Sequence, residues 1–238
     1  MLKSRVALCA AALLFSITLT AQGANLKLVP GEYETEGGWG NLVLKQGKGG
    51  VLFFSIESVG ANGHSCSVEG ELHGGKATLE GSSEDEPCLV TLMPLAEGIE
   101  VQADSCRDYC GARAGFDGTY LPLPPACTAK AIAATRKTFK QLYDARKFTA
   151  ARAKLEPLLT VCERSLDPWT DGWIRNDVAV TLHKLGDLAG CRAVLEPWVE
   201  EAERTDDELA QNLPPADAEM RAPIVRATRT NLRLCRKK

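Results

Sequence analysis

The stretch CRDYCGARAGFDGTY, residues 106–120, holds the side chains whose types and spacing could most directly do chemistry. Two cysteines four positions apart could bind a metal, exchange electrons or form disulfides with cysteines elsewhere in the chain. Arg107, Tyr109 and Arg113 add side chains of the kind that dominate binding surfaces. The stretch is therefore a candidate metal or redox centre, a candidate recognition loop, or a turn fixed by disulfides.

A metal site in this stretch would combine Cys106 and Cys110 with His64 and His73. Zinc-binding cysteines usually stand closer together, as C-x₂-C pairs, and an oxidising compartment converts free thiols into disulfides. A redox centre would need a C-x-x-C motif in a strand–helix context, which the sequence lacks. We therefore expect no metal and no cofactor.

The rest of the chain shows no catalytic motif. The three histidines, at 64, 73 and 183, lack the spacing to cysteine, serine or carboxylate that a triad or a zinc site needs. No glycine-rich phosphate loop is present, and the acidic turn SSEDEP at 82–87 does not have EF-hand spacing. We expect a protein that is not an enzyme; a hydrolase with a carboxylate pair in a cleft is the alternative.

The first 23 residues predict export. Lys3 and Arg5 precede a short apolar run, and small residues at 21 and 23 fit a signal-peptidase site, so cleavage is expected near Gly23. No later run approaches the ~18 apolar residues of a membrane span. The mature chain is therefore predicted to be periplasmic or secreted and to have no transmembrane segment. Nucleic acid is not an expected partner of an exported chain.

Export makes disulfides the expected state of the cysteines. Eight remain without the one in the signal peptide, and an even number in an exported chain predicts a disulfide framework. A predicted hairpin brings Cys88 close to Cys106, which favours Cys88–Cys106 and leaves Cys66–Cys110. The rival pairing, Cys66–Cys88 with Cys106–Cys110, stays open.

The other four cysteines fit antiparallel helix pairs. Cys127 and Cys162 are symmetric about a predicted helical turn near residues 144–145, and Cys191 and Cys235 are symmetric about the Pro-Pro pair at 214–215. This favours Cys127–Cys162 and Cys191–Cys235, each worth roughly 3–4 kcal/mol. No disulfide is expected to join the two halves of the chain.

Composition divides the mature chain near residue 126. Residues 24–126 contain 15 acidic and 6 basic residues, a net charge of −9, together with 17 of the 21 glycines. Residues 127–238 contain 16 acidic and 20 basic residues, a net charge of +4. The stretch LPLPPA at 121–126 is typical of a stiff Pro-rich linker. We predict a signal peptide at 1–23, an all-β domain at 24–120 and an α-helical domain at 127–238.

Short alternating runs separated by Gly, Asn or Pro predict strands in the first domain. Eight runs qualify, and they are GEYET, NLVLKQ, VLFFSIES, SVEGEL, KATLEG, CLVTLMP, IEVQA and FDGTYLP. Their tight turns favour an antiparallel meander that closes into a small barrel or sandwich. Phe116 and Tyr120, four apart on the last run, are expected to pack inward.

After residue 126 the hydrophobic periodicity becomes helical, over 128–143 and 148–162 in particular. The motif Arg-Ala-x-Leu-Glu-Pro occurs at 152–157 and again at 192–197, an offset of 40 residues. Two helical hairpins and a final helix are therefore predicted. Pro157, Pro197 and Pro223 are expected to kink or restart helices.

The repeat resembles tetratricopeptide-like helical repeats over roughly residues 130–203. The resemblance rests on Leu182-x-x-Leu185-Gly186-Asp187, Cys191, Leu195 and Pro197, and in the first unit on Leu142-Tyr143, Ala151, Leu155 and Pro157. It implies a concave surface that binds proteins or peptides. The acidic first domain resembles, in outline, small periplasmic lysozyme inhibitors, which implies inhibition of a cell-wall hydrolase as an alternative function.

Two further surfaces could bind a partner. Trp169, Trp173 and Arg175 are residue types of binding hot spots, although the tryptophans could instead cap the first helical hairpin. The final helix is basic, with Arg221, Arg226, Arg229, Arg233, Arg236, Lys237 and Lys238. This face could be solvated, dock on the acidic first domain, or attract anionic lipid or cell-wall polymer.

The sequence thus predicts an α+β protein of two domains that binds a protein or peptide partner without catalysis. The residues expected to bind are Arg107, Tyr109, Arg113, Trp169, Trp173 and Arg175.

Overall fold

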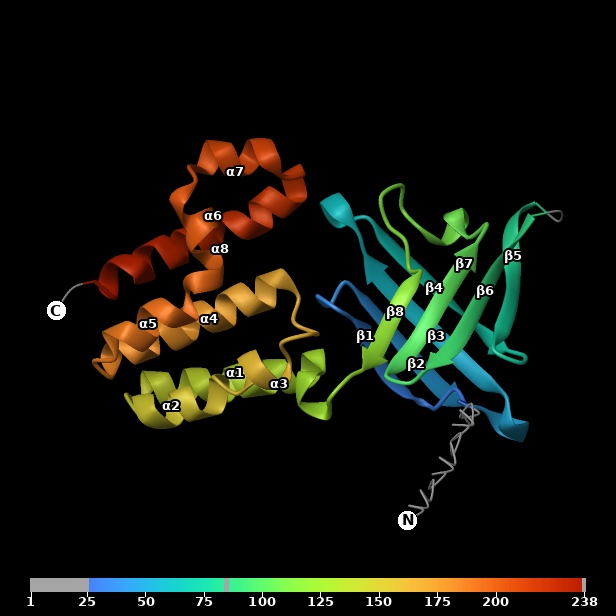
Figure 1. The fold of residues 1–238 in the computed structure, drawn as a ribbon, viewed down its shortest axis with the longest axis horizontal. Helices are drawn as coiled ribbons and strands as arrows, with labels where there is room; N and C mark the ends of the chain where they lie inside the picture. Colours follow the sequence, from blue (N-terminus) through green and yellow to red (C-terminus); the bar gives the residue numbers. More distant parts are fainter. Residues whose placement is uncertain (1–25, 84–85, 237–238) are drawn as a thin grey trace, which may run out of the picture.

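A computed structural model describes residues 26–83 and 86–236 (Figure 1). An antiparallel sheet comes first in the chain and a group of helices follows, so the protein has an α+β fold in two parts. The predicted signal peptide and the centre of the acidic turn, residues 84–85, lie outside the described residues. Within the described ranges, no helix is long and apolar enough to cross a membrane.

The eight predicted strands are all present and form one nearly closed, barrel-like sheet. They are β1 (Gly31–Thr35), β2 (Gly40–Gln46), β3 (Leu52–Val59), β4 (Ser65–Leu72), β5 (Lys76–Ser83), β6 (Glu86–Leu95), β7 (Gly98–Asp104) and β8 (Gly118–Pro122). The strand order is β4-β3-β2-β1-β8-β7-β6-β5, so the first strand pairs with the last. We call this sheet, with its connections, the barrel.

Alternation of side chains fills the barrel interior. Leu42 and Leu44 on β2 face Phe54 and Ile56 on β3, and all four are buried. Tyr120 is fully buried on β8, and its hydroxyl donates a hydrogen bond to the carbonyl oxygen of Phe116 at 2.8 Å. Phe116 is buried as well, as the spacing of these two aromatic residues predicts.

The helical part contains eight α-helices among its described residues. They are α1 (Ala129–Asp144), α2 (Phe148–Leu155), α3 (Leu158–Val161), α4 (Pro168–Lys184), α5 (Leu188–Val194), α6 (Val199–Glu203), α7 (Asp206–Asn212) and α8 (Pro215–Leu234). Short 3₁₀ turns are η1 (Lys48–Gly50), η2 (Ala61–Gly63), η3 (Arg107–Tyr109), η4 (Pro125–Cys127) and η5 (Glu196–Trp198).

The 40-residue repeat corresponds to two similar helical hairpins. Helix α1 ends at Asp144 and α4 ends 40 positions later, at Lys184. In the two turns that follow, Arg146 has φ 59° and Gly186, again 40 positions later, has φ 80°. Helices α2 and α5 then return along α1 and α4. In each turn, the residue with left-handed backbone conformation lets the chain reverse its direction within a few positions.

The prolines singled out in the sequence lie in different structural settings. The predicted linker at 121–126 is mostly regular structure, because β8 extends to Pro122 and η4 begins at Pro125. Pro157 does divide the helix expected at 148–162 into α2 and α3. Pro223, in contrast, lies inside α8 without ending it. Tertiary packing of the buried neighbours Ile224 and Val225 compensates for the hydrogen bond that proline cannot donate.

Four disulfides are present, and they are the four favoured pairs: Cys66–Cys110, Cys88–Cys106, Cys127–Cys162 and Cys191–Cys235. Two lie within the barrel and two within the helical part. Disulfides of this kind indicate an oxidising environment, outside the cell or in the periplasm.

The two parts touch where turns of the barrel meet the ends of helices. The amide of Gly37 donates to the carbonyl oxygen of Arg164 at 2.8 Å. The side-chain oxygen of Asn62 accepts from the backbone amide of Ala216 at 3.0 Å, and the backbone amide of Asn62 donates to the Asp217 carboxylate at 3.2 Å. These contacts use the first turn of α8, which is acidic. The suggestion that the basic face of the last helix docks on the acidic barrel is therefore wrong.

Candidate binding site at the stapled end of the barrel

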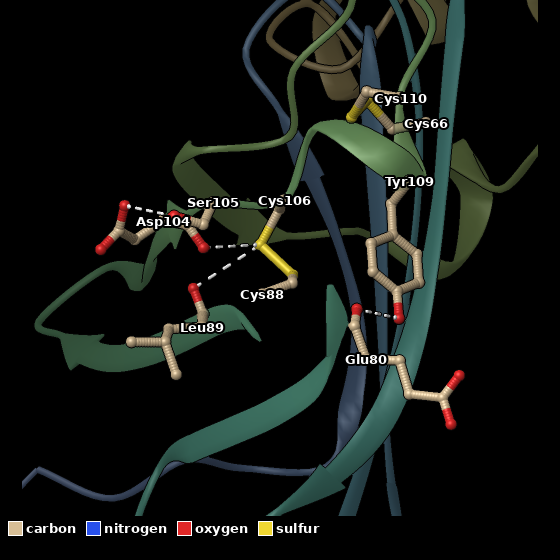
Figure 2. Close-up of a disulfide and its surroundings, with 9 residues drawn as sticks. All are labelled: Cys66, Glu80, Cys88, Leu89, Asp104, Ser105, Cys106, Tyr109 and Cys110. Carbon is tan, nitrogen blue, oxygen red and sulfur yellow. Dashed lines mark hydrogen bonds between the residues drawn. A yellow bond between two sulfur atoms is a disulfide. The ribbon is translucent and has the colours of Figure 1, made fainter. Parts of the chain in front are cut away.

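The loop between β7 and β8, residues 105–117, lies at one end of the barrel and is drawn in green in Figure 1. We call it the stapled loop. The Cys88–Cys106 disulfide ties its beginning to β6, and the Cys66–Cys110 disulfide ties its middle to β4 (Figure 2). Ser105 takes φ 57°, which turns the chain out of β7 and into η3.

Hydrogen bonds fix the rest of the stapled loop. The amide of Gly111 donates to the carbonyl oxygen of Ser65 at 2.8 Å, which continues the pairing of β4. The hydroxyl of Ser58 donates to the carbonyl oxygen of Gly115, also at 2.8 Å. A Cβ atom on Gly60 would lie 2.1 Å from the carbonyl oxygen of Arg113, so only glycine permits this close approach. The loop is therefore held at several points along its length.

Tyr109 closes the gap between the two edges of the sheet. Strands β4 and β5 are these edges, and beyond their shared turn at His73 and Lys76 no ladder joins them among the described residues. The side chain of Tyr109 packs against the barrel core, and its hydroxyl donates to the carbonyl oxygen of Glu80 on β5 at 3.1 Å (Figure 2). The next residue, Cys110, is bonded to β4. Tyr109 and Cys110 thus cover strand edges that would otherwise be open to pairing with other chains.

The exposed side chains of the stapled loop include two arginines. Arg107 and Arg113 are the only arginines between residues 24 and 126, where acidic residues dominate. Both are exposed, and neither forms an ion pair within the described part of the chain. Arg107 and Asp117 lie on a hollow of about 530 Å³ that is lined almost entirely by residues of the stapled loop. Arg107 is thus a cationic side chain beside the cavity, whereas Arg113 is not among the residues that line it.

Catalysis and metal binding receive no support from this geometry. Cys106 and Cys110 are both bonded to other cysteines, so their sulfur atoms are not available as metal ligands or as nucleophiles. Within residues 26–83 and 86–236, no three His, Cys, Asp or Glu side chains are grouped to hold a metal. The exposed side chains of the loop are carried on a backbone that two disulfides hold in place.

The second predicted cluster lies elsewhere and is largely occupied by contacts within the helical part. Trp169 and Trp173 pack against Trp198 on the core around α8, rather than over the first hairpin. The guanidinium of Arg221 lies 5.4 Å from the ring centroids of both Trp169 and Trp198. Arg175 donates to Asp171 at 2.8 Å and to the carbonyl oxygen of Val194 at 3.2 Å. The structure therefore does not join this cluster to the stapled loop.

A second cavity, of about 410 Å³, lies between the barrel and the helical part. Glu34 and Arg164 are among its lining residues. Burial, with the nearby charges of Asp167 and then Glu32, raises the pKa of Glu34 to about 7. This acid could not be recognised from the sequence, because its burial and its contact with Asp167 depend on how the two parts of the chain pack.

Sequence reasoning also missed a groove that contains part of the basic last helix. Arg229, Arg233 and Arg236 follow at i, i+4 and i+7, which is one face of a helix, and all three lie on this groove with Arg192 from α5. The spacing of these arginines in the sequence could have shown that they share one helix face. The sequence could not show which other helices lie beside that face.

The comparisons with known proteins assign no family: no family model matches the chain, and neither a curated protein nor a solved structure is significantly similar to it.

Proposed function

We propose that this is an exported, non-catalytic binding protein whose stapled loop contacts a protein or peptide partner. The observation that carries the proposal is the contrast between a backbone fixed by two disulfides and two exposed arginines without ion pairs. A rigid loop loses little conformational entropy on binding, and arginine is enriched among residues that dominate binding energy. Tyr109 is partly buried by its contact with Glu80, so we assign recognition mainly to Arg107 and Arg113.

The rest of the fold is consistent with this role. The disulfides favour a periplasmic or secreted location. The helical part then serves as a second binding scaffold of the tetratricopeptide-like kind, a proposal supported by its two hairpins at a 40-residue offset. The Trp169–Trp173–Arg175 cluster contributes mainly to the stability of that scaffold.

Inhibition of a basic cell-wall hydrolase such as lysozyme is the second candidate function. It is favoured by the acidic character of the barrel, since residues 24–126 contain 15 acidic and 6 basic residues. Carboxylates that are not neutralised within the barrel would attract a basic enzyme. A cell-wall lysis assay with lysozyme, with and without the protein, tests this candidate. Lysis at an unchanged rate with the protein in excess would exclude lysozyme as the partner.

Photo-crosslinking tests the proposed site. A photoreactive amino acid at Ala112, an exposed position of the stapled loop, should capture a partner from an extract of the exported fraction. The same group at Lys76, the exposed first residue of β5, is the control and should capture much less of it. Equal capture at both positions, or capture that survives substitution of Arg107 and Arg113 by alanine, would contradict the proposal.

A further inference from the structure

A groove of about 630 Å³ runs between α5, α6 and the C-terminal end of α8. We call it the arginine groove. Half-buried Val199 and Leu232 give it an apolar base, and exposed Arg192, Arg233 and Arg236 line it. Helix α5 and the C-terminal end of α8 lie at the end of the helical part away from the barrel (Figure 1). The groove is therefore separate from the stapled loop, and either site can fail without the other.

Arginines without a carboxylate partner are concentrated at this groove. Seven arginines of the described chain make no ion pair: Arg107, Arg113, Arg146, Arg164, Arg192, Arg233 and Arg236. Three of these seven line the arginine groove. The other three arginines of α8 each have a carboxylate partner, because Arg221 pairs with Glu201 and both Arg226 and Arg229 pair with Asp206. The groove thus collects cationic groups that the fold itself does not neutralise.

Helix capping accounts for only one of the three. Basic residues near a helix C-terminus interact favourably with the helix dipole, worth typically ~0.3–1 kcal/mol. Arg192 has this role, since it donates to the carbonyl oxygen of Cys235 at 2.9 Å. Arg233 donates only to the hydroxyl of Thr230, at 3.3 Å, and remains exposed. Arg233 and Arg236 are therefore available to a ligand.

We propose that the arginine groove binds an acidic peptide segment of a partner protein, with an apolar side chain of that segment on Val199 and Leu232. Guanidinium groups match carboxylates in a bidentate geometry, and burial of an apolar residue adds to the affinity. Two acids, Glu196 and Glu203, also line the groove. They disfavour a uniformly anionic ligand such as a lipid surface, but they accommodate a peptide in which the negative charges are spaced.

The probe for this proposal is a fluorescent synthetic peptide of about ten residues, in which glutamates flank a single leucine. Its binding to the disulfide-bonded protein is followed by fluorescence anisotropy at low salt. Two matched peptides, one with lysines for the glutamates and one with serine for the leucine, should bind at least about tenfold more weakly. Binding of the acidic peptide should also weaken as salt increases.

Substitutions on the protein locate the site. The double variant Arg233→Glu/Arg236→Glu should weaken peptide binding at least about tenfold without a change in the melting temperature, because both side chains are exposed. Ala193→Glu, which adds a negative side chain on the groove, should do the same. Two controls should leave the affinity for the peptide within about twofold of wild type. They are Lys137→Glu, a charge reversal at an exposed position on α1, and Arg107→Ala/Arg113→Ala on the stapled loop.

Several results would overturn the proposal. The wild-type protein could fail to bind the acidic peptide at low salt. Lys137→Glu could weaken peptide binding as much as Arg233→Glu/Arg236→Glu does. The peptide with serine in place of leucine could bind as tightly as the leucine peptide. Preferential binding to phosphatidylglycerol vesicles that depends on Arg233 and Arg236 would identify a membrane as the occupant instead. Self-association in the ultracentrifuge that the same double variant abolishes would identify a second copy of the chain.

Discussion

The barrel and the helical part hold themselves together by different means. Of the ten ion pairs among the described residues, nine lie in the helical part and one lies in the barrel. The barrel relies on strand pairing, an apolar interior and two disulfides that fix one end. The helices add charge pairs such as Arg136 with Asp177 at 3.2 Å, which joins α1 to α4.

This difference shows which charges are available for binding. In the barrel acidic residues far outnumber basic ones, so the two arginines stand out because they share one disulfide-bonded loop in an acidic region. In the helical part pairing is common, so an unpaired arginine is itself informative, and three of them lie on one groove. Arginine thus forms ion pairs in most of the helical part, and our proposals assign recognition to the arginines that do not.

The largest effect is expected from the disulfides, which allow a matched comparison. Cys66–Cys110 and Cys191–Cys235 both have a sequence separation of 44. Replacing either pair by serine should lower the free energy of unfolding of its own region by about 3–4 kcal/mol in urea denaturation. Of these two variants, only Cys66→Ser/Cys110→Ser should also weaken capture of the partner, because Cys191–Cys235 does not hold the stapled loop. Equal loss of capture in both variants would remove the special role of the loop.

A paired arginine should contribute to stability where an unpaired one does not. Arg221 lies over two tryptophan rings and pairs with the half-buried Glu201, so Arg221→Ala should lower the free energy of unfolding by about 2–3 kcal/mol. Arg233→Ala, on the same helix, should change it by less than about 0.5 kcal/mol. Thermal melting of the two variants measures this difference in stability. An equal loss of stability in Arg221→Ala and Arg233→Ala would contradict the prediction.

Glu34 at the contact between the two parts should make stability depend on pH. Its ordinary pKa is 4.5 and its pKa in the folded protein is about 7, so between these values the folded protein binds more protons than the unfolded chain. The free energy of unfolding should therefore fall by about 1–2 kcal/mol as the pH rises through this range. Glu34→Gln should flatten that slope in melting curves at a series of pH values. An unchanged slope would show that Glu34 is not responsible.

The smallest of these effects concerns the gap between β4 and β5. Tyr109→Phe removes the hydrogen bond to Glu80 but keeps the ring against the core, and should cost about 1 kcal/mol. Tyr109→Ala should cost more, because it also removes the ring. Hydrogen exchange of the amides in β4 and β5 would then rise in both variants. No change in these amides would show that Tyr109 does not close the gap.

Much of the fold could be predicted because its signals are local. Turn residues and two-residue alternation defined the eight strands. Symmetry about the turns favoured three of the disulfides, and Cys66–Cys110 followed as the remaining pair. The contact of Tyr109 with Glu80 could not be predicted, because it depends on how far the sheet curves before its edges meet. The arginine groove was also out of reach, since Arg192 and Arg236 approach each other only through the packing of α5 and α8.

The central claim is that arginines left unpaired on a rigid frame are there to bind, and partner affinity compared with stability tests it most directly. The partner captured at Ala112 should be titrated against wild-type protein and Arg107→Ala/Arg113→Ala, and both proteins melted in the same buffer. We predict at least about tenfold weaker binding with a melting temperature that stays the same within error. Unchanged affinity, or a loss of affinity that accompanies a matching loss of stability, would contradict the claim.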